Sequence, residues 1–150
     1  MADRGSDVKL FFRKLGPQDW EWVVSIAPIL KCDNTSGIIA IDVKADKPVA
    51  ACVFDNWTPN SVQAHFVVEN KMALKHGFLE ECCDFVFNVA GRKAVYGFIM
   101  GDNDKAIKLN KHIGFTEKMR LEDAWGDGID YVIMEMKKEN CNYLQEAKAA

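Results

Sequence analysis

The chain alternates between short apolar runs and polar connections that contain glycine, proline or aspartate. Apolar runs of this length, rich in β-branched and aromatic residues, predict strands. We expect strands at Val8–Arg13, Ile38–Val43, Val49–Phe54, Val62–Val68, Ala94–Met100, Thr116–Ala124 and Ile129–Met136. The short polar connection Lys44–Pro48 and the turn at Asp127-Gly128 predict that two pairs of these strands form hairpins.

Helical spacing of apolar residues appears in three places between these strands. The longest helix is predicted from Ala73 or Leu74 to Val89, because its apolar residues recur every three or four positions, and Gly91 ends it. A second is predicted from the capping residues Asn103 and Asp104 to Gly114. An earlier helix should start near Pro17 and reach Pro28, and Ile29–Cys32 should add one more turn.

The resulting order, β-α-β-β-β-α-β-α-β-β, predicts an α/β fold with a mixed sheet and helices on both faces. A chain of 150 residues is most simply one domain, which we place at residues 8–136. We expect residues 1–7 to be a loose tail. Residues 137–150 are predicted to be a polar tail with a short helix around Cys141–Ala147.

Composition limits the function classes. At 49% hydrophobic residues and a net charge of −3, the chain can bury a core and has no basic field for nucleic acid. No apolar run approaches the ~20 residues of a membrane span, and the N-terminus lacks the apolar core of a signal peptide. The five cysteines fit no zinc or disulfide spacing, which favours reduced thiols in a cytoplasmic protein.

The segment Gly97–Phe115 carries the most specific motif. Its ordered positions are Asn103, Ala106-Ile107, Leu109, Asn110 and Ile113-Gly114-Phe115. This pattern resembles a signature of the GNAT superfamily, the acetyl-CoA-dependent N-acetyltransferases. The resemblance implies a splayed mixed sheet of about seven strands. In such a sheet, Val62–Val68 and Ala94–Met100 are parallel neighbours that diverge, and acetyl-CoA lies in the gap as co-substrate.

Further ordered matches are similar to a divergent, RimI-like branch common in phages and prophages. These are His65, Phe78-Leu79, Asp127-Gly128, Met136 and the run Glu139, Cys141, Leu144. The resemblance implies the cytoplasm of a bacterium or of a phage-infected cell, with the virion as the alternative location.

The resemblance also implies where the cofactor binds. In the family, a glycine-rich loop before the long helix holds the pyrophosphate on backbone N–H groups. Here that loop is Asn70–Gly77, and it lacks most of the glycines. We expect Lys71, Ala73, Leu74 and Lys75 to form the site, with the two lysines supplying charge; equally, these lysines could only solubilise a helix start. Asn103 is expected to touch the cofactor, and a backbone N–H near Val67 or Val68 to stabilise the oxyanion.

Acetyl transfer needs a group that accepts a proton from the amine. His65 is the best candidate, because imidazole ordinarily titrates near pH 6.5 and the residue lies on the predicted cleft strand. A packed or solvent-facing histidine is an equally good interpretation. Glu69 is a second candidate, acting through water. Asn110 stands where many relatives carry a tyrosine acid; an amide cannot act as that acid, but it can hydrogen-bond the CoA sulfur.

These observations predict an N-acetyltransferase that acts on a primary amine of a protein or small molecule, without a metal. The alternative is a catalytically inactive GNAT-fold protein with a structural or partner-binding role, such as a virion component. Arg120, Asp123 and Trp125 are expected on the surface, with a role in the acceptor pocket as the alternative. The sequence leaves the oligomeric state open, a homodimer included.

Overall fold

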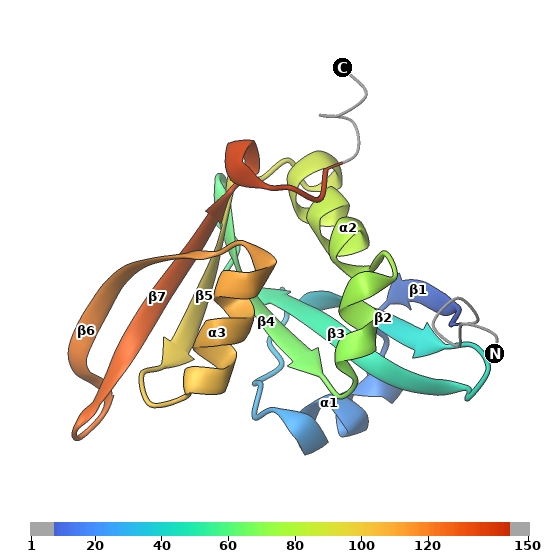
Figure 1. The fold of residues 1–150 in the computed structure, drawn as a ribbon, viewed down its shortest axis with the longest axis horizontal. Coiled ribbons are helices and arrows are strands. Elements are labelled where there is room, and N and C mark those ends of the chain that lie inside the picture. Colours follow the sequence, from blue (N-terminus) through green and yellow to red (C-terminus); the bar gives the residue numbers. More distant parts are fainter. Residues whose placement is uncertain (1–7, 145–150) are drawn as a thin grey trace, which may run out of the picture.

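The apolar runs form one seven-stranded sheet in the computed structural model, which describes residues 8–144 (Figure 1). The sheet order is β1-β2-β3-β4-β5-β7-β6. The strands are β1 Leu10–Lys14, β2 Ser36–Asp42, β3 Lys47–Asp55, β4 Ser61–Val68, β5 Ala94–Met100, β6 Thr116–Gly126 and β7 Ile129–Lys137. The predicted strands and both predicted hairpins are confirmed.

The pairing of β4 with β5, in the middle of the sheet, determines where a gap opens in the sheet. β4 and β5 pair in parallel only where Ser61–Gln63 lies beside Ala94–Tyr96. Beyond that point the two strands diverge toward their C-terminal ends (Figure 1). All other neighbouring strands are antiparallel. The predicted divergence of these two strands is confirmed, and a gap opens between them.

Helices cover both faces of the sheet. α1, Trp20–Ile26, packs Val23 against a small core that includes Ala51, Val53 and Val67. Asp19, the residue before α1, connects the start of this helix to β1. Its carboxylate accepts hydrogen bonds from both terminal guanidinium nitrogens of Arg13 at 2.6 and 2.9 Å. The same carboxylate accepts the amide of Gly16 at 2.7 Å. These donors hold the pKa of Asp19 below its ordinary value.

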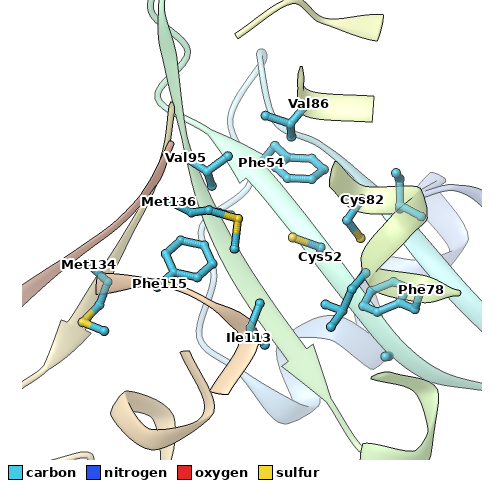
Figure 2. Close-up of a cluster of buried hydrophobic side chains, with 14 of the residues drawn as sticks. Cys52, Phe54, Phe78, Cys82, Val86, Val95, Ile113, Phe115, Met134 and Met136 are labelled. Carbon is cyan, nitrogen blue, oxygen red and sulfur yellow. The ribbon is translucent and has the colours of Figure 1, made fainter. Parts of the chain in front are cut away.

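The opposite face carries α2, Phe78–Cys83, and α3, Asp104–Ile113, over the larger core. Figure 2 shows this core, in which Phe54, Phe78, Ile113 and Phe115 meet. Cys52 and Cys82 are buried there as free thiols, as predicted, and their side chains interact. α3 begins and ends at the predicted residues, with Asn103 as its N-cap and Gly114 as its C-cap.

The predicted long helix is wrong at its start. Lys71–Lys75 forms a separate 3₁₀ helix, and Gly77 then takes a left-handed conformation with φ 93° before α2 begins at Phe78. Glycine adopts this conformation without the steric cost that a Cβ would add. The helix continues through Asp84–Val89 as a π-helix, so the face that we assigned to Leu74 and Val89 is not one continuous stripe. Val89 is in fact 70% exposed.

Two shorter helical predictions also differ from the structure. Ile29–Cys32 is not helical, because α1 ends at Ile26 and Pro28 follows with no amide hydrogen to extend it. Near the C-terminus, Lys138–Asn140 forms a 3₁₀ helix and Cys141–Leu144 is not helical. Leu144 is nevertheless buried against the main core.

The predicted tail 1–7 and the last residues of the predicted terminal helix, 145–147, lie outside the described residues. No helix within 8–144 is long and apolar enough to cross a membrane.

Candidate active site

Three adjoining cavities lie along α3; two of them have walls from β4, and one of these two also has walls from β5. The lysine cavity, of about 480 Å³, lies between the 3₁₀ helix Lys71–Lys75 and α3. The middle cavity, of about 460 Å³, shares Lys71, Lys105 and Leu109 with it. The histidine cavity, of about 310 Å³, contains His65 and shares Phe66, Asn103, Ala106 and Leu109 with the middle one. Because neighbouring cavities share wall residues, they form one elongated path suited to an extended ligand.

The lysine cavity presents basic side chains from two elements. Lys71 and Lys75 come from the 3₁₀ helix, and Lys105, Lys108 and His112 come from α3. None of its described lining residues is acidic. Sequence reasoning singled out only the first pair for the cofactor. The signal for the others was their spacing of three and four residues, which places them on one helical face, opposite the buried Ile107 and Ile113.

Tyr143 closes the lysine cavity from the C-terminal side. Its burial, followed by nearby Cys83, raises the pKa of its hydroxyl above the ordinary value. The hydroxyl therefore stays protonated at neutral pH and adds a neutral hydrogen-bond donor beside the lysines. Tyr143 belongs to the segment predicted as a polar tail, so its position was not expected from the sequence.

The backbone of the predicted phosphate loop is largely engaged with itself. The amide of Ala73 donates to the carbonyl of Asn70, and the amide of Met72 donates to the Asn70 side chain. Ala73 is also buried in the core and is not among the described lining residues. Leu74 and Lys75 do line the lysine cavity. The amides of Met72 and Ala73 already donate hydrogen bonds within the loop. The lysine side chains are therefore better placed than these amides to bind an anion here.

The middle cavity has mostly apolar walls, and the charged side chains of Glu69, Lys71 and Lys105 also line it. Its walls include Pro28 from the segment after α1, Phe66 and Val68 from β4, and Ala106 and Leu109 from α3. The side chain of Val67 points the other way, into the α1 core. Asn103 lines the path, and its side-chain oxygen accepts the amide of Ala106 at 3.1 Å. Its capping role thus explains its orientation and keeps it at the cavity wall.

His65 lies in the histidine cavity and is held by a partner that the sequence did not reveal. Its Nε2 atom is 3.0 and 3.1 Å from the two carboxylate oxygens of Asp55. Both side chains are partly buried. An ionised carboxylate only accepts hydrogen bonds, so this contact favours the tautomer in which Nε2 carries the hydrogen, and in the neutral ring Nδ1 is then the proton acceptor. Asp55 is the last residue of β3. It lies two residues beyond Val53, which is the pairing partner of His65 on the neighbouring strand β4.

Asn110 reaches the same cavity from α3. It is 7% exposed, and its amide nitrogen donates to the carbonyl of Ala106 at 2.9 Å. Its side-chain oxygen lies over Gly97 of β5, where even a Cβ atom would approach it to 3.2 Å. Gly97 therefore makes room for Asn110. The oxygen of Asn110 is an acceptor at the junction of α3 and β5, and it has no proton to donate as an acid.

Aromatic side chains complete the far wall of the histidine cavity. Phe98 and Tyr131 pack edge-to-face with ring centroids 5.3 Å apart, and Trp125 lies beside them in the lining. Trp125 is 52% exposed, as expected for a surface residue, and it also lines this cavity. Arg120 and Asp123 also follow that expectation: Arg120 pairs with Glu117, and Asp123 accepts the amide of Gly128 inside the hairpin.

Comparison with known proteins identifies the fold. No protein-family model matches the sequence, and no curated protein matches it at a significant level. Among solved structures, spermidine/spermine N-acetyltransferase SpeG from Vibrio cholerae, in complex with manganese ions, matches with a TM-score of 0.72. The match has 14% identity and covers 90% of this chain and 95% of that chain. A dodecameric structure of the Vibrio cholerae enzyme in an intermediate state matches with a TM-score of 0.69, 15% identity and coverage of 87% and 94%.

This chain has the GNAT fold. The match covers most of both chains, which agrees with the fold expected from the Gly97–Phe115 motif. At this level of identity the likeness establishes the architecture. The RimI-like branch, the phage context and the roles of single residues stay predictions. No group of three or more metal-ligating side chains occurs within residues 8–144.

Proposed function

We propose that this protein is an N-acetyltransferase that moves an acetyl group from acetyl-CoA to a primary amine in the cytoplasm. The observation that carries the proposal is the continuous path from five basic side chains, through an apolar passage between the diverging strands, to a histidine. CoA has the same three parts in the same order: phosphates, an elongated neutral arm and a terminal sulfur.

The residues present fit CoA by their chemistry. Lys71, Lys75, Lys105 and Lys108 would bind its phosphates, since ammonium groups bind phosphate oxygens through charge-assisted hydrogen bonds. Phe66, Ala106 and Leu109 would contact the neutral arm. A backbone N–H of β4 near Val67 or Val68 would hydrogen-bond the acyl oxygen, because the gap leaves part of that strand edge without a neighbouring strand. Asn103 and Asn110 would orient the end of the arm.

When bound, acetyl-CoA supplies a thioester, whose carbon–sulfur bond breaks as the amine nitrogen bonds the acyl carbon to give the amide and the CoA thiol. Nδ1 of His65 accepts the proton that the amine loses. Asp55 holds the ring and stabilises the imidazolium that results. The sulfur takes one proton from water or from the imidazolium, so protons balance over the cycle.

A catalytically inactive GNAT-fold protein is the second candidate. Two observations favour it: Asn110 stands where relatives carry an acidic tyrosine, and the phosphate loop lacks glycines and uses its own amides. The first feature concerns protonation of the sulfur and the second concerns how the phosphates are held. Neither removes the path of basic, apolar and histidine-lined cavities.

Calorimetric titration with acetyl-CoA and with CoA, followed by a thiol-release assay over an amine panel, separates the candidates. We expect both ligands to bind and at least one amine to release CoA thiol. Binding without release from any amine would favour the inactive protein, and an absence of binding would overturn the proposed cofactor path.

A further inference from the structure

The histidine cavity differs from what a polyamine would require. A polyamine enters an active site with one amine that reacts and at least one ammonium group that keeps its charge. Burying a charge is costly unless a group of opposite sign pairs with it. None of the described residues that line this cavity is an aspartate or glutamate. The nearby carboxylate of Asp55 is already paired with His65.

Beside the polar side chains of His65, Asn103 and Asn110, the cavity offers apolar and aromatic surface. Phe98 and Tyr131 form one wall, Trp125 stands beside them, and Pro28 and Ile29 face the cavity from the segment after α1. Aromatic walls of this kind bury an apolar ligand body and favour edge-to-face contact with a second ring. The exposed face of Trp125 leaves its ring available to an incoming molecule.

The same surroundings assist the chemistry. Removing an amine from water into an apolar cavity disfavours its charged form and so lowers its pKa. A single amino group next to His65 would thus lose its proton more readily, and His65 lines the cavity where that proton is released. A second ammonium on the same molecule would suffer the same desolvation with no gain in reactivity.

We propose that the acceptor is a monoamine whose amino group is attached to an aromatic or apolar body, rather than a polyamine. This inference rests on the proposed transferase function. The body would lie against Phe98, Trp125 and Tyr131, with its nitrogen toward His65. A small arylalkylamine and the N-terminal amine of a peptide that begins with phenylalanine share this chemistry.

The test compares 2-phenylethylamine, butylamine, spermidine and the peptide Phe-Ala-Ala at saturating acetyl-CoA. We expect kcat/KM for 2-phenylethylamine to exceed that for spermidine by at least about tenfold, which corresponds to about 1.4 kcal/mol. A higher kcat/KM for the peptide than for 2-phenylethylamine would identify the N-terminus of a protein or peptide as the source of the acceptor amine. Calorimetric titration of the CoA-loaded protein with 2-phenylethylamine and with spermidine gives the same ranking without turnover.

Trp125→Glu adds a carboxylate at the cavity rim, where the side chain is exposed and folding should tolerate it. This variant should lose affinity for 2-phenylethylamine and gain affinity for spermidine. Met119→Glu is the control, since it adds the same charge at an exposed site of the same strand and is not a described lining residue.

Spermidine binding and turnover equal to or better than those of 2-phenylethylamine, with acetyl-CoA bound normally, would overturn this inference and leave the transferase function standing. Failure of acetyl-CoA to bind would instead overturn the function itself.

Discussion

At the scale of single residues, the chemistry depends on which atom of His65 is left to accept a proton. The sequence indicated the histidine and its strand, because both follow from position along the chain. It could not indicate Asp55, which is ten residues away and approaches only through the antiparallel pairing of β3 with β4. Phe98, Trp125 and Tyr131 were hidden for the same reason: they come from three strands, and only the sheet order brings them to one wall.

Replacing His65 with glutamine should lower the rate of acetyl transfer by ~10²–10⁴-fold, the usual cost of losing a general base. Affinity for acetyl-CoA should change little, because the lysines lie at the other end of the path. Single-turnover kinetics and calorimetry measure the two quantities separately. The rate of the wild type should fall at low pH, where the imidazole is protonated. The rate of the variant should not show this fall.

Asp55→Asn should give an intermediate rate and a shifted pH profile, since an amide no longer fixes the hydrogen on Nε2. A fully active His65→Gln variant would place the base elsewhere.

The ion pair between Arg13 and Asp19 gives a prediction about stability. Asp19→Asn should lower the free energy of unfolding by about 1.5–3 kcal/mol at pH 7, the usual range for hydrogen bonds to a charged group. The folded pKa of Asp19 is lowered, first by the hydrogen bonds from Arg13. Its contribution is therefore complete above the unfolded pKa of about 3.9 and is lost as pH falls through the folded pKa.

Urea unfolding of wild type and Asp19→Asn at pH 7 and at pH 2.5 measures this difference. We expect the gap between the two proteins to shrink at the lower pH. A gap of equal size at both values would show that the carboxylate charge contributes nothing.

At the scale of elements, apolar periodicity predicted strands well and one helix poorly. Each strand is bounded by turn residues, and every strand except β1 and β6 contains buried residues, so the pattern that predicts a strand is local. The long helix failed because Gly77 interrupts a pattern that otherwise continues from Leu74, and because the π-helical turn after Cys83 changes which residues share a face. This break moves Lys71 and Lys75 onto their own 3₁₀ helix, opposite the lysines of α3.

Two opposing elements that carry like charges should bind an anion in a salt-dependent way. Lys71→Glu combined with Lys75→Glu should weaken CoA binding by about tenfold or more at low ionic strength, and by less at high ionic strength, because exposed charges are screened. Calorimetry at two salt concentrations measures the change. Lys93→Glu with Lys137→Glu is the matched control, since both lysines are exposed and flank β5 at the end where it pairs with β4.

An equal loss of CoA affinity in both double variants would point to a general effect of net charge. Unchanged affinity in the first variant would remove these two lysines from the site.

At the scale of the whole molecule, the sheet consists of two parts, β1–β4 and β5–β7, that meet along only three residue pairs. A ligand that lies in the gap touches both parts, through β4 on one side and β5 and α3 on the other. CoA at 100 times its Kd should therefore add about 2.7 kcal/mol to the free energy of unfolding, as for any ligand that binds only the folded state. Calorimetric melting should show that CoA raises the melting temperature by several degrees. The Asp19→Asn variant should melt at a lower temperature without CoA and show the same rise with it.

The short junction between β4 and β5 has one more consequence. Both strands are central in the sheet, yet beyond Gln63 and Tyr96 each has the properties of an edge strand, with backbone N–H and C=O groups that no neighbouring strand satisfies. Edge strands are where separate chains add to one another and aggregate, and proteins usually protect them with charge, proline or a covering element. Here the lysines at the mouth of the gap and the arm of the bound ligand would give that protection. The ligand path is thus also a place, besides the outer strands β1 and β6, where the ligand-free protein is open to strand addition by another chain.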